Sequence, residues 1–541
     1  MTRPLQRFSP PVSLVVCWLA LSSFPATAQQ VQTNPSVIFE DHHDTSPPLR
    51  DLARTVSSQE AAGHPREVRD LGERNKPASV KPQADPVVQS SAGPAVGTIA
   101  GVNFAGIGKG DYGFQGIYTP PDTNGVAGAT QFVHVVNASY AVFDKTNGNL
   151  LLGPFNLRTL WQGFGGPCAT KDIVDPIAQY DKAAKRWLIG GIGNWLNGPP
   201  VYECLAVSQT SDATGAYNRY AISFIASQST RPFDDKLAVW PDAYYLGYDF
   251  RDGSAQVCAL DRGKMLAGLP MTAVCFVGPG NQDNLLPADL DGSVSPPTGA
   301  PNYFIGGLNN APNTLNLFKF HVDFANPANS TFTGPFVITV ASYTQACAGF
   351  GGFNDCIPQK GTHQLIESLS DRLMYRNAYR NFRSNSAQVG HETLVVNHSV
   401  NAGSSVGVRW YELRALENGK FTLFQQGTYA PDAHFRWMGS IAMDKAGDIA
   451  LGYSLSSGTI NPSISYTGRV PTDPPGIMEG ENSIIAGGGF QSYDRWGDYS
   501  GMSVDPVDDC TFWFTTEYLK TNGGQASWST RIASFKFPGC R

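Results

Sequence analysis

Short runs of apolar and aromatic residues, broken by Gly, Asn and Asp, follow one another from about residue 97 to the C-terminus. Such runs, bounded by turn-forming residues, are typical of β-strands joined by tight turns. One phrase recurs, in which an apolar stretch leads to an Asp at a turn and then to an apolar return strand. It is found at residues 141–151 (AVFDKTNGNLL), 440–451 (SIAMDKAGDIAL) and 502–513 (MSVDPVDDCTFW). The pattern predicts an all-β fold made of repeated strand–turn–strand units.

The repeated units have equivalent starting points that lie about 53 to 68 residues apart along the chain. These starting points are Asp122, Asp175, Asp235, a position near Tyr303, Asp371, Arg436 and Asp498. Seven units of that size fit a seven-bladed β-propeller, in which each blade is a four-stranded antiparallel sheet. The fourth unit is placed by spacing alone, so six or eight blades remain open. A pair of β-sandwiches is the alternative fold, although a sandwich does not require the regular period.

The N-terminal part of the chain has a different texture from the repeats. Residues 1–28 contain Arg3 and Arg7, then an apolar stretch, then Ala26-Thr27-Ala28, an order typical of a secretory signal peptide. Residues 29–96 are rich in Pro, Ser, Gln and charge, which predicts a disordered leader or linker, or a pro-segment removed on maturation. The β-propeller domain is therefore expected over residues 97–541. No later apolar run is long enough to predict a membrane-spanning helix.

Composition narrows the choice of partners. The chain has 541 residues, with 39 Lys and Arg against 45 Asp and Glu, and a net charge of -6. A chain with that balance has no electrostatic attraction to a phosphate backbone, so nucleic acid is excluded as a partner. The 57 Gly and 38 Pro agree with many turns. We expect an exported protein, secreted or periplasmic, whose partner is a glycan or another protein; the sequence does not indicate an oligomeric state.

Eight cysteines remain after the signal peptide, and their spacing groups them into local couples. An even number of cysteines in an exported chain indicates disulfide bonds rather than thiolate metal sites. The simplest pairing is Cys168–Cys204, Cys258–Cys275, Cys347–Cys356 and Cys510–Cys540.

The candidate site follows from the repeat. In a propeller the first strand of each blade lines the central channel, so residues at one offset in every unit form a ring at the channel mouth. The acidic members of this predicted ring are Asp122, Asp175, Asp235 and Asp498, with Asp371 beside them. The cations of the ring are Lys236, Arg372, Arg436 and Arg495.

Carboxylates crowded into one mouth must share protons, pair with cations or bind a metal ion. Unequal pKa values would make Asp122, Asp175, Asp235 and Asp498 catalytic acids, bases or nucleophiles for cleavage of a glycan, with Arg372, Arg436 or Arg495 holding an acidic sugar group. A ring of oxygen ligands would suit Ca²⁺, although cleavage by carboxylates requires no cofactor. Ion pairs that only join the blades are the structural alternative, and all three interpretations stay open.

Aromatic residues in Gly- and Asn-rich loops favour a sugar partner, because an exposed ring can stack on a sugar face. The loop aromatics are Trp161, Trp195, Tyr466, Phe490, Tyr493 and Trp496, of which Trp195, Tyr466 and Trp496 are predicted to bind substrate. Packing between blades is the alternative role for each of them. Signatures of metalloproteases, esterases and P-loop NTPases are missing from the sequence.

Several phrases resemble a group of uncharacterised bacterial secreted proteins with propeller-like repeats. They are residues 120–123 (PPDT), 164–168 (FGGPC), 239–242 (VWPD), 436–444 (RWMGSIAMD) and 495–499 (RWGDY). The resemblance implies export and repeat structure over residues 100 to 540, and it brings no catalytic residue with it. The chain is also distantly similar to sialidase-type propellers, but no window matches their Ser-x-Asp-x-Gly-x-x-Trp turn.

The predicted ring and the loop aromatics lead to two hypotheses for function. One is a glycoside hydrolase or polysaccharide lyase, and the other is a non-catalytic propeller that binds a glycan or a protein.

Overall fold

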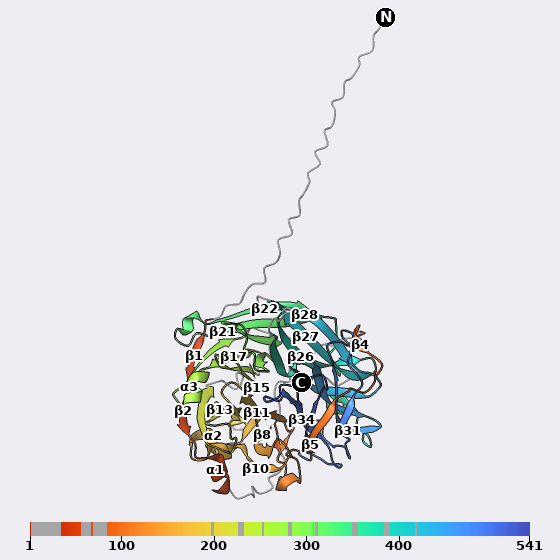
Figure 1. Cartoon of the computed structure of the whole chain (residues 1–541). Helices are drawn as coiled ribbons and strands as arrows, with labels where there is room; N and C mark the ends of the chain where they lie inside the picture. Colours follow the sequence, from red (N-terminus) through yellow and green to blue (C-terminus); the bar gives the residue numbers. More distant parts are fainter. Residues whose placement is uncertain are drawn as a thin grey trace.

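The structure is a computed structural model. It describes residues 1, 34–55, 66–68, 84–195, 200–224, 232–250, 254–279, 284–306, 308, 312–348, 355–382, 390–416 and 419–541. The predicted signal peptide, apart from its first residue, lies outside the described residues. Strands dominate the described chain and are arranged around a common centre (Figure 1). The all-β fold predicted from the sequence is confirmed.

The described strands form successive groups of four, each antiparallel. The first three groups are β7 (Asn124–Ala127), β8 (Gln131–Val136), β9 (Ser139–Asp144) and β10 (Leu150–Asn156); β11 (Ile173–Asp181), β12 (Arg186–Gly193), β13 (Val201–Ser208) and β14 (Tyr217–Phe224); and β15 (Pro232–Val239), β16 (Tyr244–Phe250), β17 (Ala255–Leu260) and β18 (Thr272–Val277). The next two groups share one sheet, because their first strands pair in parallel. They are β19 (Leu286–Leu290), β20 (Asn302–Gly306), β21 (Thr314–His321) and β22 (Thr331–Thr339); and β25 (Met374–Phe382), β26 (His391–Ala402), β27 (Ser405–Ala415) and β28 (Phe421–Tyr429).

The chain closes the ring with strands from both of its ends. The sixth group is β29 (Phe435–Met443), β30 (Ile449–Ser457), β31 (Ile460–Arg469) and β32 (Asn482–Ile485). The last group combines β33 (Gly501–Val504), β34 (Phe512–Tyr518) and β35 (Ser529–Lys536) with β5 (Ile99–Ala105), which precedes the first group in sequence. The first strands contact one another in a closed cycle, from β7 through β11, β15, β19, β25, β29 and β33 back to β7. This architecture is a β-propeller.

Short elements connect or flank the groups. They are the helices α1 (Leu49–Thr55), α2 (Gly166–Thr170) and α3 (Arg262–Ala267), the 3-10 turns η1 (Asp111–Gly113), η2 (Leu157–Trp161) and η5 (Pro327–Asn329), and the strands β3 (Arg66–Glu67), β6 (Tyr118–Thr119), β23 (Asp355–Ile357) and β24 (Ile366–Glu367). No helix among the described residues is long and apolar enough to cross a membrane.

Apolar side chains fill the space between neighbouring groups. Trp240, which follows β15, is buried against Tyr379 of β25, with ring centroids 4.6 Å apart, and against Tyr303 of β20. These two aromatic contacts join three successive groups, and packing between neighbouring groups in this way holds the ring together.

All four predicted disulfides are present. Cys168 of α2 is bonded to Cys204 of β13, and Cys258 of β17 to Cys275 of β18. The other bonds join Cys347 to Cys356 and Cys510 to Cys540. Each bond lies within one repeat unit or a connecting loop, so the local couples seen in the sequence are confirmed.

The prediction of a disordered leader over residues 29–96 is wrong for its described parts. The strands β1 (Ser36–Phe39), β2 (His42–Thr45) and β4 (Val88–Gln89) extend the outer edges of three groups by pairing with β18, β14 and β28. Figure 1 shows β1, β2 and α1 at the rim of the ring. Arg219 of β14 donates to both carboxylate oxygens of Asp44 at 2.7 and 2.6 Å. Backbone hydrogen bonds to exposed strand edges order this polar segment, and such bonds cannot be predicted from its low hydrophobic content.

The helix α1 tests whether the leader contributes to stability. Leu49 is fully buried among residues of the first two groups, so Leu49→Ala should lower the free energy of unfolding by about 2–5 kcal/mol. Leu269→Ala is the matched control, because its side chain is 53% exposed, and it should change stability by about 0.5 kcal/mol or less. Urea unfolding of the two variants measures both effects. Equal stability of the two variants would mean that α1 does not pack on the propeller.

Candidate functional site

Aspartates recur at one end of the first strands because the backbone there adopts a left-handed conformation. The φ angles of Asp122, Asp175, Asp234 and Asp498 are 47°, 53°, 55° and 58°. Asp and Asn adopt this region more readily than most residues with a side chain. The pairing registers of β11 and β15 also shift at these positions, as in a β-bulge. The repeated bulge thus brings carboxyl groups from separate groups of strands to the same end of the channel.

The third group places Asp234, rather than the predicted Asp235, at the bulge. Asp234 accepts hydrogen bonds from Arg372 at 2.7 Å, from the Tyr499 hydroxyl at 2.8 Å and from Lys236. Burial acts to raise the pKa of Asp234, but the Lys236 and Arg372 cations outweigh it and hold the pKa below its ordinary value. Asp234 is therefore an ionised carboxylate at this end. Arg372 donates to Asp234 and also to Asp371, the latter at 3.0 Å.

Asp235 is fully buried beside other acids. Within the described part of the chain, neither of its carboxyl oxygens has a hydrogen-bond partner. Burial, reinforced by the neighbouring Glu203 and Asp175, raises its pKa well above the ordinary value. Burial likewise raises the pKa of Glu203, on β13, to about 8. Both groups therefore retain a proton at neutral pH.

Asp122 and Asp175 lie side by side. Burial, together with the charges of Asp498 and Asp175, raises the pKa of Asp122 well above its ordinary value, and the two side chains are hydrogen-bonded to each other. The backbone N–H of Asp234 donates to Asp175 at 3.2 Å, and the N–H of Asp175 donates to the Asn137 side chain at 2.9 Å. A protonated carboxyl thus sits against a second carboxyl that accepts a backbone hydrogen bond.

Arg495 ties the last group to this cluster. It donates to Asp498 at 2.7 Å, to Glu367 at 2.9 Å and to the backbone oxygen of Val68 at 3.1 Å. Burial raises the pKa of Glu367 to about 7 even with Arg495 beside it. Val68 belongs to the leader, so the N-terminal segment reaches the same end of the channel as the carboxyl groups.

We refer to the side chains at this end as the carboxyl cluster. Its carboxyl groups outnumber its cations, so proton retention rather than ion pairing balances much of its charge. The acidic members are Asp122, Asp175, Glu203, Asp234, Asp235, Glu367, Asp371, Asp498 and Glu517, and the cations are Lys236, Arg372 and Arg495.

Arg436, predicted for the same ring, lies in a separate network. It is fully buried and donates to Asp432 at 2.9 and 3.0 Å and to Glu481 at 2.8 and 2.9 Å. These paired hydrogen bonds use its guanidinium group as a structural link between β29 and the β32 region. No described contact joins Arg436 to the carboxyl cluster, so the prediction of a place in the ring is wrong.

The predicted exposure of the substrate-binding aromatics is also wrong. Trp496 is fully buried and donates from its indole nitrogen to Ser454 at 3.0 Å. Tyr466 is 6% exposed and stacks on Phe535, with ring centroids 3.7 Å apart. Trp195 is buried near Val68, in the wall of a cavity described below. Trp161 is likewise buried, whereas Phe490 and Tyr493 are half-buried.

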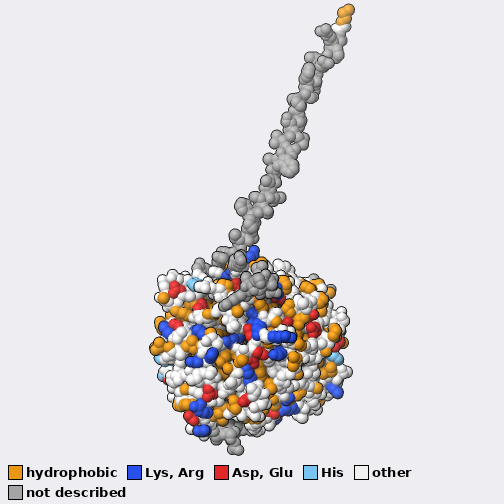
Figure 2. Space-filling model, in the orientation of Figure 1, with side chains coloured by type: hydrophobic (Ala, Val, Ile, Leu, Met, Phe, Trp, Pro, Cys, Tyr) orange, Lys and Arg blue, Asp and Glu red, His pale blue; other side chains and the backbone are white. Residues whose placement is uncertain are grey.

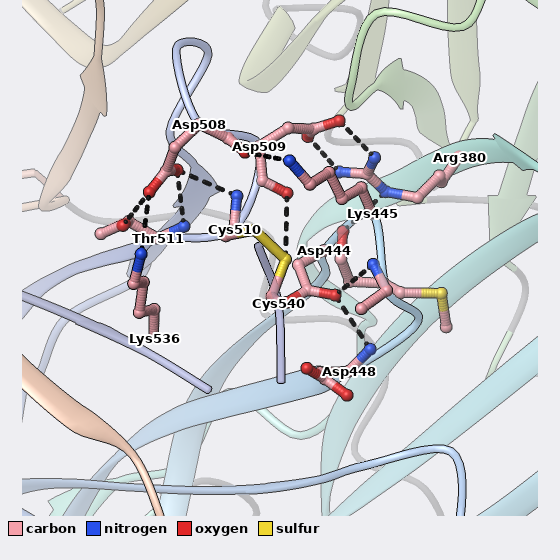
Figure 3. The surroundings of a disulfide bond; sticks show 12 residues. Arg380, Asp444, Lys445, Asp448, Asp508, Asp509, Cys510, Thr511, Lys536 and Cys540 are labelled. Carbon is pink, nitrogen blue, oxygen red and sulfur yellow. Dashed lines mark hydrogen bonds and ion pairs between the residues drawn. A yellow bond between two sulfur atoms is a disulfide. The ribbon is translucent and has the colours of Figure 1, made fainter. Parts of the chain in front are cut away.

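A Ca²⁺ site requires several oxygen ligands close to one another. Among the described residues, the group whose ligand atoms lie within 4.8 Å of one another is Asp444, Cys510 and Cys540. Figure 3 shows that the two cysteines form a disulfide there, so they have no thiolate to offer a metal. Among the described residues, no three members of the carboxyl cluster have ligand atoms that all lie within 4.8 Å of one another.

The opposite end of the first strands has a different electrostatic character. Several of its carboxylates are paired with cations, as in Lys182–Asp291 at 2.8 Å and Arg380–Asp509 at 2.7 Å (Figure 3 shows the second pair). Asp444 differs, because burial and the neighbouring Asp448 raise its pKa to about 8. Figure 2 shows Lys, Arg, Asp and Glu side chains of both signs near the middle of the face in view.

Sequence reasoning missed Glu203, Asp234, Glu367 and Glu517 as members of the cluster, and it missed Tyr499, which donates to Asp234. Glu203 and Glu517 each stand as a single acid within an apolar strand, VYECLAVS and FWFTTEY. A lone carboxyl in a strand of otherwise mostly apolar residues is a signal that could have found them, because burying it requires a partner or a proton.

No family model and no curated protein matches the sequence. The chain is similar in structure to the WD40 domain of SCAP from fission yeast, with 9% identity and a TM-score of 0.34 over 75% of this chain and 82% of that one. It is also similar to an exo-β-1,3-galactanase from Clostridium thermocellum, with 10% identity and a TM-score of 0.32 over 82% and 97%. Drosophila Plexin A in complex with Semaphorin 1b gives 7% identity and 0.28 over 84% and 88%. The propeller architecture therefore rests on the strand pairing itself.

The protonation of Glu203 predicts how stability depends on pH. An unfolded Glu loses its proton near its ordinary pKa of 4.5, whereas the folded protein retains the proton up to about pH 8. The folded state therefore binds more protons across that window, and the free energy of unfolding should fall as the pH rises through it. Glu203→Gln, which mimics the protonated acid, should flatten this decline in urea unfolding measured from pH 5 to 8. Glu479→Gln is the control and should keep the wild-type slope; a wild-type slope in Glu203→Gln would contradict the assignment.

Proposed function

We propose that the chain is an extracellular carbohydrate-active enzyme, a glycoside hydrolase or polysaccharide lyase, that works at the carboxyl cluster. The observation that carries the proposal is the unequal protonation of adjacent buried carboxyl groups. Asp122 and Asp235 have raised pKa values, whereas Asp234 beside them is held ionised by Lys236 and Arg372. Carboxyl groups whose environments push their pKa values apart can serve as acid and base at one pH.

The contacts suggest a division of roles. Asp122, carrying a proton at neutral pH, would donate it to the glycosidic oxygen of the leaving sugar. Asp175, next to it, would act as the base or nucleophile, and the Asp234 N–H bonded to it would stabilise its charge. Asp235 and Asp498 would adjust the local potential or supply a second acid. In a lyase, the same base would remove the proton beside the carboxylate of an acidic sugar.

The extracellular location is part of the proposal. It is supported by the secretory pattern of residues 1–28 and by the four disulfides, which persist in oxidising compartments. The resemblance of the repeat phrases to secreted bacterial propeller-like proteins points the same way. The reaction as proposed needs no cofactor; a dependence on Ca²⁺ would be detected by a chelator.

A second candidate function is a non-catalytic propeller that binds a glycan or a protein. The burial of the carboxyl groups favours it, because Asp122, Asp175 and Asp235 are only 1%, 6% and 0% exposed. The leader also reaches the cluster, through the hydrogen bond from Arg495 to the backbone oxygen of Val68. In this case the cluster would be a polar core that fixes the ring, and a partner would bind elsewhere on the propeller.

Asparagine variants separate the two functions. The purified mature chain is incubated with neutral and acidic polysaccharides, with and without chelator, and new reducing ends and unsaturated products are followed. Asp122→Asn and Asp175→Asn should each lower turnover by about 100-fold or more, because general acid–base groups contribute that much. Asp444→Asn, a fully buried Asp at the opposite end of the strands, is the control and should keep its activity.

New reducing ends without unsaturation identify a hydrolase, and unsaturation identifies a lyase. Turnover that survives both cluster variants would remove Asp122 and Asp175 from the chemistry. A wild-type protein that is folded, binds a polysaccharide and yet cleaves none of them would support the binding propeller instead.

A further inference from the structure

A small polar cavity lies beside the carboxyl cluster, outside the groups assigned to chemistry above. Its volume is about 300 Å³, and it is open to solvent where β11 begins and the leader strand β3 pairs in parallel with β6. The residues that line it are Arg66, Arg158, Thr170, Lys171, Asp172, Val174 and Trp195. Its walls come from the leader, from the first two groups of strands and from the end of α2.

The lining carries an excess of positive charge. Asp172 is the acid among the lining residues, and it accepts hydrogen bonds from Asn156 at 3.0 Å and from Tyr118. Arg158 and Arg66 reach the same carboxylate only at 3.3 and 3.4 Å. Two neutral donors and two guanidinium groups thus contact the same carboxylate. Lys171 adds a third cation and forms no ion pair within the described part of the chain.

The cations expected to hold an acidic sugar are engaged elsewhere. Arg372 is taken up by Asp234 and Asp371, and Arg436 by Asp432 and Glu481. Those guanidinium groups are buried, so a ligand could reach them only by displacing their carboxylate partners. Arg66 and Arg158 also pair with Asp172, but their side chains are 57% and 37% exposed and line an open cavity.

The cavity lies about one or two sugar units away from Asp175, the proposed base or nucleophile. Asp172 precedes Asp175 by three residues, and an extended chain of that length spans at most about 10 Å. Val174, in the cavity wall, is the residue before Asp175. A charged group held by Arg158 and Lys171 would therefore place the neighbouring part of a polymer over Asp175 and Asp122.

We propose that this cavity is an anion subsite, which binds a carboxylate or sulfate group of an acidic glycan through Arg66, Arg158 and Lys171. Arginine suits such a ligand because its planar fork matches the two oxygens of a carboxylate or sulfate. The buried Trp195 forms the wall of the subsite and does not serve as a stacking platform. This inference rests on the proposed function, and it makes the substrate an acidic rather than a neutral polysaccharide.

Binding to paired polymers tests the subsite. The mature chain is measured by affinity electrophoresis against polygalacturonate and its fully methyl-esterified form, and against dextran sulfate and dextran. We expect retardation by at least one polyanion and little by its neutral partner. Arg158→Gln and Lys171→Gln should each weaken binding to the retained polyanion about tenfold. Binding should also weaken as salt is added, because the cations are partly exposed.

The control variant is Lys360→Gln, which removes an exposed lysine that does not line the cavity. It should bind like the wild type, and all three variants should unfold at wild-type urea concentrations. Lys171→Gln keeps the test decisive if Arg158→Gln is destabilised, because Lys171 has no ion pair to lose in the described chain. Binding to polygalacturonate indicates a carboxylate ligand, and binding to dextran sulfate indicates a sulfate ligand.

The outcomes separate this inference from the proposed function. Equal binding to charged and neutral polymers, or equal loss in Lys360→Gln and Lys171→Gln, would overturn the anion subsite even if a neutral glycan is cleaved. Charge-dependent binding that is lost in Arg158→Gln and Lys171→Gln, with no cleavage of any polymer, would uphold the subsite while the enzymatic proposal fails.

Discussion

The pairing of β5 with β35 holds the rest of the structure in place. A propeller group packs only on its two neighbours, so the ring stays open unless the first and last groups are joined. Here the strand at Ile99–Ala105 completes the sheet made by the C-terminal strands, and the two ends of the domain become one sheet. Closing the ring fixes the distances between all the first strands, and with them the positions of the carboxyl groups that these strands bring together.

The carboxyl cluster shows how a backbone requirement can produce a chemical site. Each bulge needs a residue that tolerates a left-handed φ, and Asp meets this need at Asp122, Asp175, Asp234 and Asp498. Asn284 and Met438 have similar φ angles near the starts of β19 and β29, so the conformation does not require an acid. The acids therefore gather on one side of the ring, where burial makes each additional negative charge costly and protonation replaces ionisation.

The sequence allowed the repeat, the turn phrase and the four disulfides to be predicted, because each leaves a local pattern of residue types. It also located Asp122, Asp175 and Asp498. It could not separate Asp234 from Asp235, because a bulge adds a residue and shifts which neighbour faces the channel. Trp496 stands in a Gly-rich loop and Tyr466 lies on strand β31, and both are buried by residues distant in sequence, such as Ser454 and Phe535. The leader is polar, yet backbone pairing with exposed strand edges orders its described parts.

The two ends of the channel differ in how the charge of their buried carboxyl groups is neutralised. At the turn end, Asp291, Asp505 and Asp509 each have a cation within hydrogen-bond distance, as expected of charges whose role is to join groups. Asp444 is the exception there, because burial and the nearby Asp448 raise its pKa to about 8. At the bulge end, Asp235 and Glu203 are buried without a cation of their own and must hold protons. Stability alone would favour apolar residues at such positions, because a buried acid that stays protonated gains little from its polarity. An arrangement that costs stability and concentrates titratable groups at one mouth is typical of a site kept for chemistry or binding.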